Sequence, residues 1–123
     1  MNFPANLRYA KTHEWVKDIG NGLYEIGISD YAQKELGDIV YVNLPQLGDE
    51  LEAGVSFADL ESVKAVTDIL SPINGTVIEV NEAVVSGPDA INKAPYEAWF
   101  IRVEGSLIDM LLSAEEYEKS LES

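Results

Sequence analysis

Residues 60–68 read Leu60-Glu61-Ser62-Val63-Lys64-Ala65-Val66-Thr67-Asp68, so one lysine stands between small and apolar neighbours. Carboxylates flank this lysine at Asp59, Glu61 and Asp68. Charged side chains mostly lie in water, and an exposed strand lysine screened by nearby acids is therefore the simplest interpretation. The local sequence favours a second interpretation, in which Lys64 is the residue that the domain presents.

The segments on either side of Lys64 favour short strands. Residues 55–60 and 66–70 are rich in apolar and β-branched side chains, although their alternation is imperfect. No glycine, proline or asparagine marks a turn at residues 63–65. Propensity alone therefore does not place Lys64 at the tip of a hairpin.

Further strands are predicted on both sides of this centre. Residues 8–16 and 23–28 are candidates for a hairpin, because the turn signal Asp18-Ile19-Gly20-Asn21-Gly22 separates them. Residues 37–43 and 75–81 share a pattern of glycine, two β-branched aliphatics, valine and asparagine, and both predict a strand. This weak internal repeat predicts two similar halves in one small all-β unit.

Helices are predicted at two places. Asp30 as a cap with Gln33, and Gly37 just past the end, predict a short helix over residues 30–36. The segment of about residues 106–121 is also predicted to be helical, because two capping patterns occur in it, Ser106 with Asp109 and Ser113 with Glu116. Its candidate buried stripe consists of Leu107, Met110, Leu111 and Tyr117. Between these helices, residues 82–95 predict a long surface loop and residues 96–103 the last strand.

Length and composition bound the class of protein. A chain of 123 residues is expected to form one domain, over residues 1–123. The net charge of −14 argues against binding nucleic acid or an anionic membrane through a basic face. With no apolar stretch long enough to span a bilayer and no signal pattern at the N-terminus, the chain is expected to be soluble. A cytoplasmic location is preferred over the mitochondrial matrix.

Few residues offer catalytic chemistry. The chain has no cysteine, which removes thiol nucleophiles and thiolate metal sites. Its single histidine, His13, stands in no recognisable nucleophile context. His13-Glu14 begins like a zinc-protease helix, but the residue four positions after His13 is Lys17. We expect no catalytic residue and no metal site; an enzyme using His13 with acids and a plain interaction module are the alternatives outside the carrier class.

Covalent modification of a lysine is the chemistry that fits best. A carrier domain needs an exposed primary amine on a rigid, narrow projection, so that a modifying enzyme reaches it and the tethered group swings between active sites. Tethering keeps the group at a high effective concentration near each docked partner. Among the lysines of this chain, only Lys64 has a neighbourhood of this kind.

Three segments carry a resemblance to a known family. Glu61-Ser62-Val63-Lys64-Ala65 resembles the lipoyl-attachment sequence of lipoyl-carrying domains, and residues 71–81 resemble the strand pair that follows it. With His13-Glu14-Trp15 upstream, the chain is similar to the H proteins of the glycine cleavage system. Biotin carriers use a similar fold, but their lysine typically lies between methionines, whereas Val63 and Ala65 flank it here.

The resemblance implies a mostly β, lipoyl-domain-like flattened barrel or sandwich of two quasi-symmetric halves, with a short helix and a helical C-terminus. It implies lipoic acid in amide linkage on Lys64, with Glu61, Ser62, Val63 and Ala65 as the attachment motif. The protein would then be a non-catalytic carrier of the aminomethyl group of glycine. Its partners would be glycine decarboxylase (P protein), aminomethyltransferase (T protein), dihydrolipoamide dehydrogenase (L protein) and the lipoylating enzymes.

The resemblance also implies a cleft that holds the loaded arm away from water. Its lining positions match Thr12, Glu14 and Asp68, and the two carboxylates suit a cationic amine. The alternative is that both are solvated acids. Trp15 is expected to pack in the core. Within the carrier class the alternatives are a lipoate-relay protein, a lipoyl domain of 2-oxoacid dehydrogenases and a biotin carrier, and the residues 13–15 and helical C-terminus favour the H protein over the last two.

Overall fold

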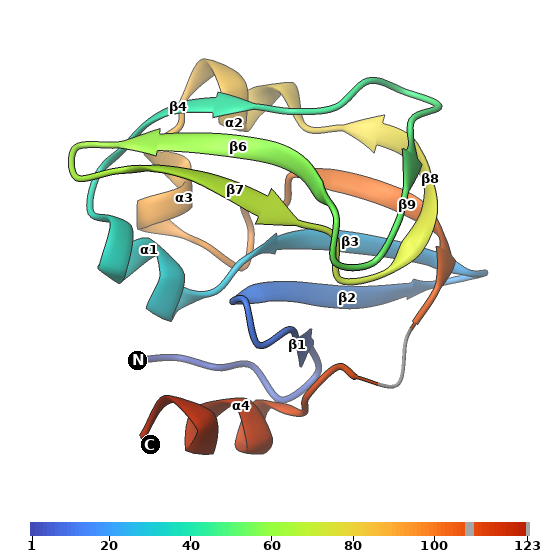
Figure 1. The fold of residues 1–123 in the computed structure, drawn as a ribbon, viewed down its shortest axis with the longest axis horizontal. Coiled ribbons are helices and arrows are strands. Elements are labelled where there is room, and N and C mark those ends of the chain that lie inside the picture. Colours follow the sequence, from blue (N-terminus) through green and yellow to red (C-terminus); the bar gives the residue numbers. More distant parts are fainter. Residues whose placement is uncertain (108–109, 123) are drawn as a thin grey trace.

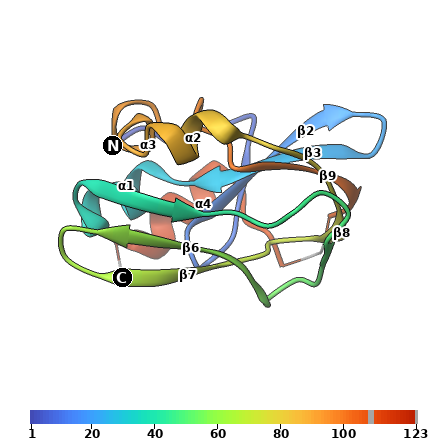
Figure 2. The same ribbon diagram turned by 90° about the horizontal axis from the view of Figure 1, so that it is seen from above.

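The computed structural model describes residues 1–107 and 110–122, and this part of the chain forms two antiparallel sheets. The larger has the order β1 (Arg8–Tyr9), β2 (Glu14–Gly20), β3 (Leu23–Ile28), β9 (Ile101–Ser106), β8 (Asn74–Val80) and β5 (Glu50–Leu51). The smaller has the order β4 (Ile39–Asn43), β6 (Ser56–Ser62) and β7 (Val66–Leu70). Figures 1 and 2 show the sheets as two layers. The predicted mostly β class is confirmed, and β4 and β8, the strands of the internal repeat, lie one in each sheet.

The core lies between the two sheets and follows the period-two pattern of strands. In β6, for example, Ala58 and Leu60 are buried, while Asp59 and Glu61 point the other way. Apolar side chains from β3, β8 and β9 meet them from the opposite layer, among them Ile26, Val77 and Val103. Full burial of one such side chain contributes about 1.5–3 kcal/mol.

The predicted N-terminal hairpin is confirmed with one difference. Asn21 and Gly22, both with positive φ, form the two-residue turn between β2 and β3, as hairpin turns of this length require. The strand expected over residues 8–16 is instead two strands, β1 and β2. A turn interrupts it, in which the His13 N–H donates to the Ala10 carbonyl (2.9 Å) and His13 has a φ of 82°.

The helix α1 (Asp30–Leu36) has the predicted extent but a different cap. Ser29, not Asp30, is the N-cap, because its backbone is extended and its hydroxyl accepts from the Ala32 N–H (3.2 Å). Asp30 instead accepts a hydrogen bond from the Gln33 side chain (2.7 Å). Gly37 ends the helix with a φ of 76°, as predicted.

The prediction of a surface loop over residues 82–95 is wrong. The segment forms two short helices, α2 (Glu82–Ser86) and α3 (Ala90–Lys93), separated by residues 87–89. Val84 and Ile91 are buried in the core. These two apolar anchors stabilise helices too short to persist alone in water.

The C-terminal prediction is correct at its end and wrong at its start. Ser106 is the last residue of β9, which begins at Ile101 rather than near residue 96, and α4 (Ala114–Leu121) begins eight residues after Ser106. The Ser113 and Glu116 capping box is confirmed, whereas Asp109 lies outside the described residues. Of the predicted stripe, Leu111 and Tyr117 are buried, but Leu107 and Met110 are exposed.

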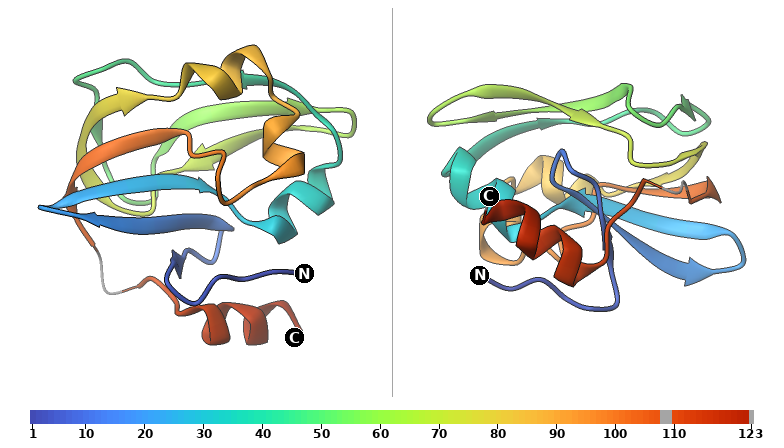
Figure 3. Two further views of the ribbon diagram at one scale, coloured as in Figure 1. Left: turned by 180° about the vertical axis from the view of Figure 1, so that it is seen from behind. Right: turned by 60° about the horizontal axis from the view of Figure 1, so that its bottom comes forward.

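An aromatic cluster docks α4 beside the N-terminal segment, so both termini lie at one side of the molecule (Figure 3). Tyr117 stacks on Tyr9 (4.7 Å between ring centroids, 5° between planes), and Phe3 packs edge-on against Tyr117 (5.4 Å). Trp15 belongs to the same cluster and is fully buried, which confirms its predicted packing role. Its indole N–H donates to the Pro95 carbonyl (3.0 Å).

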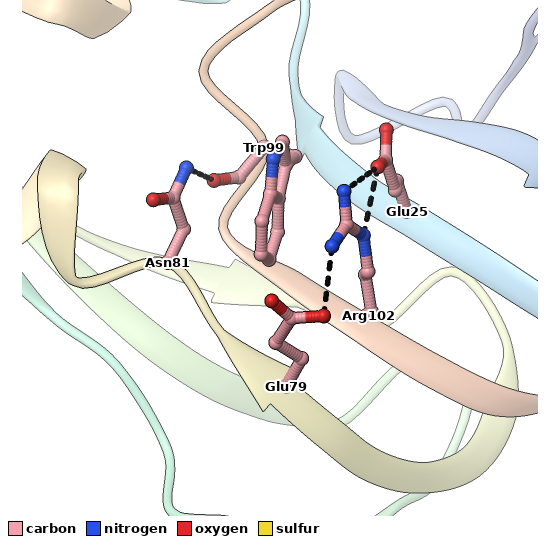
Figure 4. A network of polar contacts seen from close by, with 5 residues as sticks. All are labelled: Glu25, Glu79, Asn81, Trp99 and Arg102. Atoms are coloured by element: carbon pink, nitrogen blue, oxygen red, sulfur yellow. Dashed lines mark hydrogen bonds and ion pairs between the residues drawn. The ribbon is translucent and has the colours of Figure 1, made fainter.

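On the larger sheet, Arg102 connects three strands (Figure 4). Its guanidinium pairs with Glu25 of β3 (2.8 Å) and Glu79 of β8 (2.7 Å) and lies over the Trp99 ring (4.1 Å). The two carboxylates raise the pKa of Arg102 further. This cluster stabilises the register of β3, β9 and β8, which belong to the sheet that does not lead to Lys64.

Asn92 of α3 holds together the end of α1 and the start of β4. Its side-chain amide donates to the Gln33 side chain (3.1 Å) and the Gly37 carbonyl (2.9 Å), and its oxygen accepts from the Ile39 N–H (2.9 Å). We expect Asn92→Ala to lower the free energy of unfolding by about 1–3 kcal/mol in urea titrations, because it leaves three partners unpaired.

The matched control is Lys93→Ala on the same helix. Lys93 is exposed and makes only a surface ion pair with Asp89 (2.9 Å), so the change is expected to stay within about 0.5 kcal/mol. Equal losses in the two variants would contradict the structural role given to Asn92.

Candidate functional site

Lys64 lies in the tight turn between β6 and β7, which we call the attachment hairpin (residues 56–70). The Ser62 hydroxyl accepts hydrogen bonds from the N–H groups of Lys64 (3.2 Å) and Ala65 (3.1 Å), and the Ser62 N–H donates to the Ala65 carbonyl (2.8 Å). A serine side chain thus supplies the turn chemistry that glycine, proline or asparagine would otherwise provide. Ser62 was the turn signal that sequence reasoning missed.

The tip of the hairpin lies against Gly37 and Asp38, the two residues that follow α1. The Val63 N–H donates to the Asp38 carbonyl (3.0 Å), and a Cβ placed on Gly37 would lie 3.5 Å from Lys64 Cε. Because Gly37 has a positive φ, only glycine adopts this conformation without strain. In Figure 1 the β6–β7 loop lies at the same end of the molecule as α1. The lysine stem therefore lies beside Gly37, while its amine is exposed and has no ion-pair partner among the described residues.

The outer face of the smaller sheet exposes apolar side chains around this amine. Tyr41, Glu61 and Val66 are cross-strand neighbours on β4, β6 and β7. Tyr41 is 50% exposed, Val63 65% and Val66 70%. The next cross-strand row adds Asp59 opposite Asp68. Lysine, aliphatic and acidic groups therefore share one accessible face.

A cleft of about 300 Å³ lies between the start of β2, helix α1 and strand β7. All three residues predicted for the arm line it, namely Thr12, Glu14 and Asp68. Its other lining residues are His13, Ile28, Tyr31, Ala32, Glu35, Leu36, Thr67 and Ile69. We call this space the arm cleft. Asp68 is four positions after Lys64, at most about 13 Å of extended chain, so the cleft opens near the hairpin tip.

Glu14 is the buried acid of the arm cleft. It is only 2% exposed, and its carboxylate accepts a hydrogen bond from the Thr12 hydroxyl. Burial raises the pKa of Glu14 to about 7, against the opposing effect of hydrogen bonds from Thr12 and the backbone. Glu14 is thus not a solvated acid, whereas Asp68 is exposed. Near neutral pH a cleft with such a carboxyl is able to hold a proton or to accept a cationic amine.

His13, Tyr31 and Glu35 line the cleft without having been predicted there. His13 Nδ1 lies 2.7 Å from the Tyr117 hydroxyl, and its ring contacts that of Tyr31. Burial lowers the pKa of His13, and the nearby Glu35 carboxylate opposes this. Their lining role depends on where α1 packs, for which the sequence holds no local signal. In the described ranges, no group of three or more His, Asp or Glu side chains is arranged to hold a metal ion.

Residues 7–123 match the family described as "Glycine cleavage H-protein". The chain belongs to this family. It is 51% identical over 123 residues to the glycine cleavage system H protein of Carboxydothermus hydrogenoformans, covering 97% of this chain and 94% of that protein. It is 52% identical over 122 residues to the H protein of Geobacillus kaustophilus, covering 96% and 95%. The crystal structure of a glycine cleavage system H protein from Mycobacterium marinum superposes with a TM-score of 0.91 at 35% identity, covering 98% and 99%.

Family membership confirms the resemblance that was seen in the attachment motif and the His13-Glu14-Trp15 segment. It favours an H protein over a biotin carrier or a lipoyl domain of 2-oxoacid dehydrogenases. The likeness extends over nearly the whole length of these relatives, so the hairpin, α1 and α4 all belong to the shared fold.

The raised pKa of Glu14 predicts a pH-dependent cost in stability. Its folded-state pKa of about 7 lies above the ordinary 4.5, so the folded protein holds this proton more tightly, and the contribution to stability falls as the pH rises through this window. Glu14→Gln removes the ionisation but keeps an acceptor for Thr12. Its stability relative to wild type is expected to rise by roughly 1–3 kcal/mol from pH 4.5 to 7 and then level off, as measured by urea unfolding.

The control is Glu118→Gln, which changes an exposed acid of α4. Its difference from wild type is expected to stay constant across the same pH range. A Glu14→Gln difference that did not change with pH would show that Glu14 ionises in the folded protein as it does in the unfolded chain.

Proposed function

We propose that this member of the glycine cleavage H-protein family carries lipoic acid on Lys64 and shuttles the aminomethyl group of glycine within the glycine cleavage system. The protein is a carrier component of that system. The observation that carries the proposal is the exposed amine of Lys64, which forms no ion pair within the described residues, on a hairpin turn closed by Ser62 and near a cleft that contains a buried carboxyl group. A carrier needs both an accessible attachment point and a place to keep what it carries.

The residues around Lys64 fit a lipoyl group in amide linkage. When attached, lipoic acid supplies a dithiolane that takes up and releases the aminomethyl group. Ser62 fixes the turn, and Gly37 lies beside the lysine stem. Val63 and Ala65 are small enough to leave the amine accessible to a lipoylating enzyme. The motif residues thus act through shape rather than through reactive groups.

The arm cleft fits a cationic amine. Glu14 is buried and accepts from Thr12, while Asp68 stands at the rim, so an entering ammonium group meets one carboxyl in a low-dielectric site and a second near water. A positive charge beside Glu14 favours its ionised form. The charge-assisted pair and the exclusion of water together slow hydrolysis of the carried group.

The face around Lys64 fits several successive partners. Tyr41, Val63 and Val66 form an exposed apolar centre, and Asp59 and Glu61 supply negative charge beside it. In the described part of the chain these two acids pair with no lysine or arginine. Enzymes with a basic rim around their active-site entrance would dock on this face. We assign it to the lipoylating enzymes, glycine decarboxylase, the aminomethyltransferase and dihydrolipoamide dehydrogenase.

None of the helices in the described residues is long and apolar enough to cross a membrane. The relatives named above come from bacteria, which supports the cytoplasm rather than a mitochondrial matrix as its location.

Lipoylation of Lys64 is the direct test of attachment. Incubating the protein with a lipoylating enzyme and lipoate is expected to add one lipoyl group, confined to the peptide that contains Lys64, as seen by intact-mass and peptide mass spectrometry. Lys64→Arg keeps the charge but is not acylated, so it is expected to stay unmodified. Modification at another lysine would contradict the assignment. So would the absence of any modification under conditions in which a known acceptor is lipoylated.

The arm cleft is tested by the lifetime of the carried group. Glu14→Ala removes the buried partner of the amine, and the loaded protein is expected to lose its group to water about tenfold faster, as one charge-assisted hydrogen bond would predict. Ammonia release from the isolated loaded protein is the measurement. Glu104→Ala, an exposed acid on β9, is the control and is expected to leave the rate unchanged. An unchanged rate in Glu14→Ala would remove the protective role of Glu14.

A further inference from the structure

Tyr117 of α4 lies at a junction that the proposed function does not use. None of the residues that line the arm cleft comes from α4. Tyr117 is nevertheless fully buried, and its hydroxyl lies 2.7 Å from His13 Nδ1 and 2.7 Å from Ser29 Oγ. One oxygen therefore contacts the residue just before β2 and the residue just after β3.

These two residues lead to opposite walls of the arm cleft. His13 is part of the first wall, between Thr12 and Glu14. Ser29 caps α1 by accepting from the Ala32 N–H (3.2 Å), and α1 supplies the second wall through Tyr31, Ala32, Glu35 and Leu36. The walls are also linked by the hydrogen bond from the Ser29 N–H to the His13 carbonyl (2.9 Å), by the ring contact of His13 with Tyr31 and by the pairing of β2 with β3. The Tyr117 hydroxyl completes a ring of contacts between the walls.

The conformation of His13 makes this link consequential. His13 has a φ of 82°, a strained conformation for a residue with a side chain, which persists only where surrounding contacts hold it. Its backbone leads directly into Glu14. A shift at His13 would therefore move the carboxyl group that faces the cleft.

We propose that Tyr117 is a positioning residue for the arm cleft: its hydroxyl sets the spacing between the wall that contains Glu14 and the wall formed by α1. The C-terminal helix thereby controls how well the carried group is shielded, without touching it. This role rests on the proposed function of the cleft. Its geometric part, the coupling of the two walls, holds for the unmodified chain as well.

The variant Tyr117→Phe isolates the hydroxyl. Phenylalanine keeps the stack on Tyr9 and the edge contact with Phe3, so α4 is expected to stay docked. The matched control is Tyr9→Phe. Tyr9 belongs to the same stack and is equally buried, and its hydroxyl hydrogen-bonds the Pro4 carbonyl (2.8 Å) and interacts with Tyr96 rather than with His13 or Ser29. A general loosening of the aromatic cluster would affect both variants alike.

The first measurement is amide hydrogen exchange in the unmodified protein. Tyr117→Phe is expected to speed exchange of the Ser29 and Ala32 amides about three- to tenfold, the effect of one hydrogen bond, while Tyr9→Phe leaves them at the wild-type rate. Wild-type exchange rates in Tyr117→Phe, or the same acceleration in Tyr9→Phe, would overturn the coupling.

The second measurement is the rate at which the loaded, lipoylated protein loses its group to water. Tyr117→Phe is expected to raise this rate about three- to tenfold, and Tyr9→Phe to leave it unchanged. Slow loss in wild type with no change in Tyr117→Phe overturns the positioning role alone. Loss from wild type as fast as from a free loaded lipoamide overturns the shelter itself, and the proposed function of the cleft fails with it.

Discussion

The hydroxyl of Ser62 is the contact on which the presentation of Lys64 depends. It accepts from two successive backbone N–H groups and so closes a turn that has none of the usual turn-forming residues. The strands that meet there carry buried residues on one face, which fixes their register. Gly37, which ends α1 with a positive φ, lies beside the lysine stem. The exposed lysine side chain thus starts from a well-defined point on the backbone.

Charge is used differently at the surface and in the cleft. The net charge of −14 comes from carboxylates that mostly lie in water, where they affect solubility and association more than stability. Glu14 is the exception, since burial holds its pKa near 7 and makes its ionisation sensitive to what occupies the cleft. Among the acids that the structure describes, Glu14 is the buried one. Position within the fold, and not composition, gives it that property.

The sequence predicted those features that depend on local patterns. The strands around Lys64, the extent of α1 and the Ser113 capping box follow from neighbouring residues, and the attachment motif itself is contiguous. The helices at residues 82–93 were missed because their stability comes from burying Val84 and Ile91 against distant strands. The start of α4 was placed too early because β9 continues its pairing with β8 as far as Ser106, a long-range interaction. His13 and Glu35 were not placed in the cleft for the same reason.

The attachment hairpin and the arm cleft differ in how they are assembled. The hairpin is a local structure whose turn is closed within four residues, 62–65, whereas the cleft needs three segments separated by much of the chain. Local structures form early and at small entropic cost, and non-local ones form late. Under the proposed function, modification would depend on the hairpin and safekeeping on the cleft, so the two would respond to different substitutions. A change that removed the cleft would leave the turn that presents Lys64 intact.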